Sequence, residues 1–144
     1  MTWPLVTVLG EAIPGDGFDG WQNYWNLWWV KKALLDLHQN PFHTDYIFYP
    51  LGTSFVLYTY VLYHALVSLP LQPFLPLPAV SNLLLILSTV LSAYGTYLLM
   101  GYLLRRDGRG RELPSEVQWL AALGAGIFYA FAAPRAVYAA LGHY

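Results

Sequence analysis

An uncharged run over residues 79–104 constrains the fold of this chain more than any other feature. About 20 apolar residues in an α-helix cross the hydrocarbon core of a bilayer, so this run predicts a membrane helix. A second uncharged run, 117–133, predicts another. Ser115 and Gln118 have the spacing of a capping box at its start, and Pro134 is expected to end it.

The small share of charged side chains excludes an ordinary soluble enzyme. Only 10% of the residues are charged and 57% are hydrophobic, whereas about a quarter are charged in soluble domains. The formal net charge of -1 provides no basic surface for nucleic acid. The chain has no cysteine, which excludes disulfides, thiolate catalysis and cysteine metal sites. The remaining class is a membrane protein.

The arginine-rich loop between the two runs predicts their orientation. Four of the seven basic residues lie in the loop 105–115, and basic loops stay in the cytoplasm. The first helix then runs inward and the second outward, which brings residues 134–144 to the outer side. Residues 1–13 are apolar but too short to span. We expect them to be the end of a truncated first membrane helix, in a fragment of a longer protein.

Segment 53–69 is open to two interpretations. It is apolar, with Thr53 or Ser54 as its N-cap and Pro70 as a stop. If it spans, the segment before it is cytoplasmic. If it is a juxtamembrane or re-entrant helix at the outer face, residues 14–52 form an outer loop. Its tyrosines favour the second interpretation, because aromatic side chains concentrate at membrane interfaces.

Four of the six tryptophans share one face of a helix that we expect over residues 20–38. Their spacing is i, i+4, i+7 and i+8; they are Trp21, Trp25, Trp28 and Trp29. A tryptophan-rich face with a polar back fits an amphipathic helix in the membrane interface. Alternatively, the rings pack against neighbouring helices. We expect either role before ligand stacking.

Two carboxylates, Asp16 and Asp19, lie in a glycine-rich turn just before this helix. Glycine allows backbone conformations that bring side chains and a ligand close together. The pair could act as a general base or hold a divalent cation. Asp19 and Gln22 also have the spacing of a helix cap, whereas Asp16 has no such structural explanation.

Four further residues could bind a ligand. His43 and Asp45 lie in the turning segment 40–52 and could reach a metal or a phosphate, although local hydrogen bonding is the more usual role of such a pair. Arg135 follows a membrane helix. It either extends to the headgroups or pairs with a lipid phosphate. His143 lies on the same side.

The predicted membrane helices mainly offer packing features. Ala122 and Gly126 form a small-xxx-small pair, which is an ordinary device for close helix contact. Asn82 is expected to hydrogen-bond a neighbouring helix, and His64 to be a buried histidine with a partner. Within the first run, the small residues form a stripe along the helix: Ser81, Ser88, Ser92 and Gly95.

The order of these features is similar to that of a known group of membrane proteins. It comprises Thr2-Trp3-Pro4-Leu5, Pro14-Gly15-Asp16, Asn23-xx-Asn26-Leu27-Trp28-Trp29, Phe48-Tyr49-Pro50-Leu51-Gly52-Thr53, the arginine-rich turn, Pro134-Arg135 and Gly142-His143. It resembles the N-terminal part of bacterial multi-span glycosyltransferases of the GT-C type, family 39-like, and of uncharacterised membrane proteins of that group. The resemblance implies an all-α polytopic fold in the bacterial inner membrane, with the tryptophan-rich interfacial helix in the first outer loop.

The resemblance also implies an activity. Such enzymes move a sugar from a polyprenyl-phosphate donor to an acceptor at the outer, periplasmic or extracellular face, and an acidic residue early in the outer loop is typically catalytic. Here that residue is Asp16 or Asp19, as a base or as a ligand of a divalent cation. Arg135 would bind the lipid phosphate, with His143 and His43 as further substrate-binding residues. The chain by itself is expected to be inactive.

Two other classes compete with this interpretation. In a non-catalytic accessory or structural subunit of a larger membrane complex, the tryptophan face would bind another membrane subunit, and Asp16 and Asp19 would be helix caps. A transporter is less favoured, because the two clear runs hold no charged residue that would mark an ion path.

Overall fold

The computed structural model describes residues 3–15, 19–106 and 114–141. The protein is all-α in character, as expected, with 65% helix and 3% strand. In chain order the elements are α1 (Trp3–Thr7), α2 (Asp19–Lys31), the π-helical turn η1 (Lys32–Asp36), β1 (His43–Thr44), β2 (Thr53–Ser54), α3 (Leu62–Ser68), α4 (Leu77–Arg106), α5 (Ser115–Ala130) and α6 (Ala133–Ala140).

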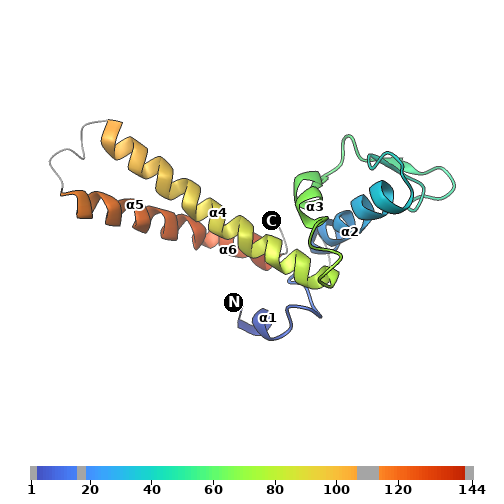
Figure 1. The fold of residues 1–144 in the computed structure, drawn as a ribbon, viewed down its shortest axis with the longest axis horizontal. Coiled ribbons are helices and arrows are strands. Elements are labelled where there is room, and N and C mark those ends of the chain that lie inside the picture. The colour runs from blue at the N-terminus through green and yellow to red at the C-terminus, as the bar shows by residue number, and fades with distance from the viewer. Residues whose placement is uncertain (1–2, 16–18, 107–113, 142–144) are drawn as a thin grey trace.

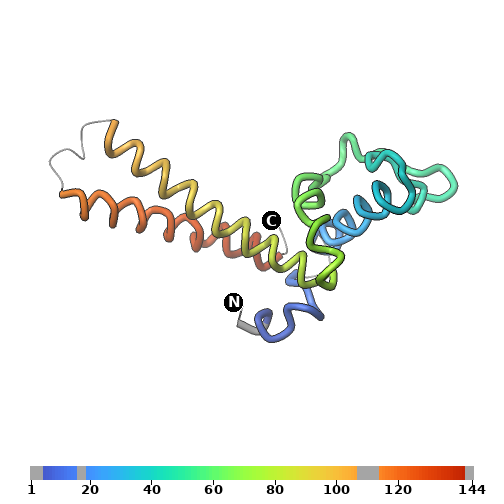
Figure 2. The backbone as a smooth tube through the Cα atoms, in the orientation of Figure 1, coloured from blue at the N-terminus to red at the C-terminus, as the bar shows by residue number. Residues whose placement is uncertain are grey.

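The elements form a long arm and a head (Figure 1). The arm consists of α4 with α5 packed antiparallel against it, and the head consists of α2, α3 and the short β1–β2 pair around the start of α4. The backbone tube in Figure 2 shows α6 continuing from α5 along α4 toward the head. α5 and α6 meet at an angle of 42°.

Small residues set the close contact between α4 and α5. Ala122 and Gly126 are both buried, as the small-xxx-small pattern predicts. A Cβ built on Gly126 would lie only 2.6 Å from the carbonyl oxygen of Ala93. The two backbones therefore approach to a distance that leaves no room for a methyl group at this position.

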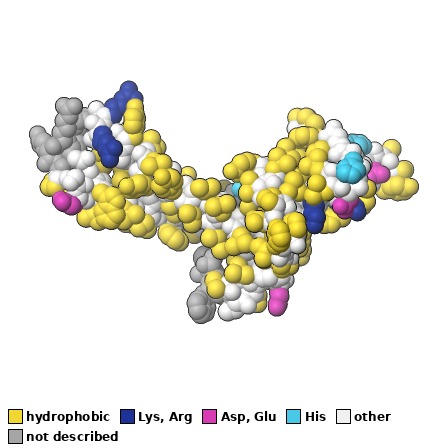
Figure 3. Space-filling model, in the orientation of Figure 1, with side chains coloured by type: hydrophobic (Ala, Val, Ile, Leu, Met, Phe, Trp, Pro, Cys, Tyr) yellow, Lys and Arg dark blue, Asp and Glu magenta, His cyan; other side chains and the backbone are white. Residues whose placement is uncertain are grey.

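The outer surface of the arm is apolar. Hydrophobic side chains cover it, with basic side chains gathered at its far end (Figure 3). Exposed examples on α4 and α5 are Ile86, Val90, Leu91, Leu98, Leu99, Leu120, Ile127 and Phe128. Soluble monomers rarely expose so many neighbouring apolar side chains. Among the described helices, α4 is long and apolar enough to cross a membrane, and the bent α5–α6 pair would make a second span if counted as one.

The head has an ordinary buried core. Leu27 of α2, Ala65 of α3 and Val80 of α4 are among its fully buried members. The Gln72 side chain donates to the carbonyl of Leu27 at 3.1 Å, which fastens the segment after α3 to α2. In α4, the large side chains that are fully buried all lie in the first third of the helix, because only this part packs against the head.

Asn82 connects this part of α4 to the N-terminal segment. Its buried side-chain amide donates to the carbonyls of Leu9, at 2.9 Å, and Ala12, at 2.8 Å. The hydrogen bond expected from Asn82 is therefore made, but to irregular backbone rather than to a helix.

The segment 53–69 differs from the expected single helix. Thr53 and Ser54 do not cap a helix but pair antiparallel with residues 43–44, and α3 begins only at Leu62. The turn requires Gly52, whose φ is +70° and where a Cβ would lie 2.7 Å from the carbonyl oxygen of Thr44. This turn brings the chain back along β1, so residues 53–54 form a strand where the first turn of a helix was expected.

Three other local expectations also need correction. The expected helix 20–38 is α-helical only to Lys31 and continues as a π-helical turn. Ser115 does not cap α5, because Pro114 is the N-cap residue and no side chain closes that end. Pro134 does not end α5, which stops at Ala130; it lies instead in the first turn of α6, where proline needs no hydrogen bond.

Candidate functional site

Arg135 lies in the first turn of α6 and reaches across to α4. Its Nη2 donates to Ser88 Oγ at 3.1 Å, and the Ser88 hydroxyl in turn donates to the carbonyl of Leu85 at 2.9 Å. The Arg135 Nε is buried, and no described residue accepts a hydrogen bond from it. A guanidinium has five N–H donors in a planar fork suited to an oxyanion. The Nε–H of this half-buried guanidinium therefore has no acceptor among the described residues.

The position of Ser88 gives the depth of this guanidinium along α4. Ser88 lies 17 residues before Arg105, which corresponds to about 26 Å of helix. The hydrocarbon core of a bilayer is about 30 Å thick. The separation of Arg105 and Ser88 along α4 is therefore comparable to that thickness. Sequence reasoning named Arg135 but assigned Ser88 only to packing; its hydroxyl inside an apolar run was the available signal.

The glycine-rich turn passes close to the end of α6. A Cβ built on Gly15, whose φ is +128°, would lie 3.2 Å from the carbonyl oxygen of Leu141. Asp19 begins α2 with an exposed side chain, and its expected capping partner Gln22 uses its amide to donate to the carbonyl of Thr59 at 2.9 Å. The other predicted residues, Asp16 and His143, lie outside the described residues.

His43 lies in a different part of the head. It is exposed in β1, where it pairs with Ser54, and Asp45 is exposed beside it. The loop that carries them lies on the side of the head away from α6 (Figure 1). The structure thus brings the acidic turn and the end of α6 together but does not bring His43 to Arg135.

The tryptophan face of α2 is largely used for packing. Trp29 is fully buried; its ring stacks on Trp25 with centroids 5.7 Å apart, and its Nε1 donates to the carbonyl of Pro41 at 2.9 Å. Phe55 lies edge-on to Trp25 at 5.7 Å. Of the two roles expected for this face, packing and contact with the membrane interface, Trp25 and Trp29 have the first. Trp21, in contrast, is 57% exposed.

Tyr60 completes this aromatic cluster, and sequence reasoning did not place it there. Its hydroxyl donates to the same Pro41 carbonyl at 2.9 Å, and its ring stacks on Phe55 at 5.3 Å. Burial raises the pKa of Tyr60 to about 12. His64, which was expected to be buried with a partner, is half-buried with its ring edge-on to Tyr63 at 5.5 Å, and burial lowers its pKa.

A groove of about 580 Å³ runs along the outer side of this cluster. Its lining includes Trp21, Trp25 and Trp28 from α2, together with Ile47 and Tyr58 from the segments that follow. The lining has the apolar and aromatic character of a site for hydrocarbon or for the apolar face of a sugar ring.

A metal ion was a further prediction for the acidic turn. The described ranges contain no group of three or more His, Asp or Glu side chains that could hold one. Of the two predicted carboxylates, only Asp19 is described, so the divalent cation stays a prediction and enters none of the chemistry below.

Comparison of the chain with models of protein families, with curated proteins and with solved structures gave no match.

Proposed function

We propose that this chain is part of an integral membrane glycosyltransferase of the GT-C type, which transfers a sugar from a polyprenyl-phosphate donor to an acceptor hydroxyl. In this proposal α4 and the bent α5–α6 pair cross the membrane, and the head lies at the outer face. The apolar outer surface of α4 and α5 and the basic end of the arm support this orientation.

The arrangement around Arg135 is the observation that carries the proposal. A guanidinium whose buried Nε has no acceptor among the described residues lies about 26 Å along α4 from Arg105, a separation comparable to the thickness of a bilayer core, about 30 Å. A polyprenyl phosphate anchored in the outer leaflet presents its phosphate at the headgroups of that leaflet. Arg135 binds the phosphate through paired charge-assisted hydrogen bonds, and Ser88 fixes the guanidinium from behind.

The acidic turn supplies the base in this mechanism. Gly15 lies against Leu141, directly after α6. The turn that carries Asp16 and Asp19 therefore starts six residues, or about 9 Å of helix, beyond Arg135 in the first turn of α6. One of these carboxylates accepts the proton of the acceptor hydroxyl as its oxygen attacks the anomeric carbon. The bond from that carbon to the phosphate oxygen breaks, and polyprenyl phosphate leaves with its charge stabilised by Arg135. His143 is a further substrate-binding candidate, whereas the loop that carries His43 lies on the side of the head away from α6 (Figure 1).

Binding of polyprenyl phosphate to the full chain in lipid nanodiscs tests the role of Arg135. The Arg135→Gln variant is expected to bind at least about tenfold more weakly, because a hydrogen bond to a charged group contributes about 1.5–3 kcal/mol. Arg106→Gln removes an equal charge at the other end of α4 and is expected to leave binding unchanged. Polyprenol, which lacks the phosphate, should bind both variants alike. Equal binding of the phosphate by wild type and Arg135→Gln would refute the assignment.

Topology tests the orientation independently. The chain has no cysteine, so single cysteines introduced in intact cells report which side each position faces. The positions are Gly17, Asp45, Gly108 and His143. Labelling from outside at all but Gly108 is expected.

Protection of Gly17 and Asp45 together with labelling of His143 overturns the outward-facing transferase. That result favours the second candidate, a non-catalytic accessory or structural subunit. The observation in favour of this candidate is the aromatic groove beside α2, with Trp21 exposed at its edge, where another membrane subunit could bind.

A further inference from the structure

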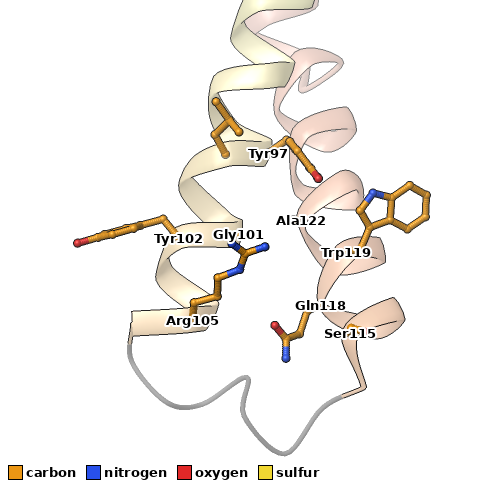
Figure 4. A pocket seen from close by; sticks show the side chains of 9 residues that line it. Tyr97, Gly101, Tyr102, Arg105, Ser115, Gln118, Trp119 and Ala122 are labelled. Carbon is orange, nitrogen blue, oxygen red and sulfur yellow. The ribbon is translucent and has the colours of Figure 1, made fainter.

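A second site lies at the basic end of the arm, away from Arg135. A pocket of about 270 Å³ opens there between the last turns of α4 and the first turns of α5 (Figure 4). Polar and aromatic side chains in its lining are Tyr97, Tyr102 and Arg105 from α4, and Ser115, Gln118 and Trp119 from α5; the remaining lining residues, Gly101 among them, are small or apolar.

Arg105 and Arg106 are adjacent in the chain but differ in their surroundings. Arg106 donates to the Tyr102 hydroxyl at 3.0 Å and lies 5.8 Å from the centre of the Tyr102 ring. Arg105 lines the pocket, and its guanidinium extends into the gap between the helices (Figure 4). One basic side chain is thus held on its own helix, whereas the other faces a space of headgroup size.

An apolar groove continues from this pocket along the helix pair. It has a volume of about 320 Å³ and shares Tyr97 and Trp119 with the pocket. Beyond these two rings, its lining is apolar or aromatic, and includes Val90, Leu123 and Ile127. A charged end joined through aromatic rings to an apolar channel has the polarity of a phospholipid, with a phosphate at one end and a hydrocarbon chain behind it.

We infer that this pocket binds the phosphate of an anionic phospholipid, with one acyl chain in the groove between α4 and α5. Arg105 provides the charge-assisted hydrogen bonds to the phosphate, while the Ser115 hydroxyl is a further polar group in the lining. Four of the seven basic residues of the chain lie within residues 105–111, so the local charge favours an anionic over a zwitterionic headgroup. The inference does not depend on the proposed transferase activity.

Pocket-filling variants provide the sharpest test. Gly101 lines the pocket, whereas Gly95 lines neither pocket nor groove. A Cβ built on either glycine would meet no atom within 4 Å. Gly101→Leu therefore fills the pocket without disturbing the helix pair, and Gly95→Leu is a matched control. Arg105→Gln and Arg106→Gln form a second pair with equal loss of charge.

Retention of phosphatidylglycerol by the purified full chain is measured by native mass spectrometry, with circular dichroism as the check on folding. Gly101→Leu and Arg105→Gln are expected to retain this lipid at least about tenfold less than their control variants. Phosphatidylcholine should compete poorly, and inorganic phosphate should not compete.

Three results overturn the inference. Equal retention by Gly101→Leu and Gly95→Leu means that the pocket is not the site. Displacement of the lipid by inorganic phosphate means a site for the free ion, and equal retention of phosphatidylcholine removes the preference for an anionic headgroup.

Discussion

Replacing Gly126 with alanine is expected to weaken the contact between α4 and α5. The added Cβ would lie 2.6 Å from the carbonyl oxygen of Ala93 and 3.4 Å from the Cβ of Tyr97. Ordinary contacts of a Cβ start at about 3.4 Å, so the helices would have to separate by roughly 0.8 Å at this point. Backbone atoms of a helix cannot turn aside as a flexible side chain can, so the whole contact must adjust.

The expected magnitude combines two opposing terms. Overpacking a close contact costs about 1–3 kcal/mol, while replacing glycine by alanine inside a helix stabilises it by up to about 1 kcal/mol. Gly124 is on the same helix, and a Cβ there would meet no atom within 4 Å. Gly124→Ala therefore keeps only the favourable term. The two variants should differ by about 1–3 kcal/mol in the free energy of unfolding, with Gly126→Ala the less stable.

Unfolding in mixed detergent micelles with increasing dodecyl sulfate, followed by circular dichroism, measures this difference. A Gly126→Ala chain as stable as the Gly124→Ala chain would refute the reasoning, because the gain in helix propensity is common to both. Such a result would mean that α4 and α5 do not approach at Ala93 in the folded protein.

Three other substitutions test the head. Asn82→Leu leaves two backbone carbonyls without their amide donor; it should cost about 2–3 kcal/mol and speed proteolysis of residues 3–15. Trp29→Phe keeps an aromatic ring but loses the hydrogen bond to Pro41, so unfolding by circular dichroism should show a loss of about 1–2 kcal/mol. Burial lowers the pKa of His64 below 6.5, so this side chain binds a proton more readily in the unfolded chain than in the folded one. The free energy of unfolding should therefore be highest above pH 6.5 and should fall as the pH drops below that value. His64→Gln should remove that part of the pH dependence, and an unchanged profile would contradict it.

Local patterns in the sequence predicted the arm well. The uncharged run 79–104 lies wholly within α4, and the spacing of Ala122 and Gly126 identified the residues buried against it. Each of these patterns lies within a single helix, so it can be recognised without knowing which distant parts of the chain pack against that helix. Helix ends were less predictable, as the missing cap at Ser115 shows, because a cap depends on the backbone angles of a single residue.

The head was predicted less well, because its elements depend on one another. The return of the chain from Gly52 to β1 makes residues 53–54 a strand, although their composition allowed a helix cap. The tryptophan spacing identified one face of α2, but Phe55 and Tyr60, which cover part of it, come from segments more than twenty residues away.

The sequence by itself determined that the chain is helical, that the run 79–104 is apolar enough to cross a bilayer, and that one end of the arm is basic. These properties follow from composition and periodicity, which act over a few turns of helix. Only the tertiary structure decided that Arg135 pairs with Ser88, that Gly15 lies against Leu141, and that Arg105 faces a pocket while Arg106 does not. The first two join residues far apart in the chain, and all three depend on the register at which packed segments meet, which is set by the fit of whole surfaces.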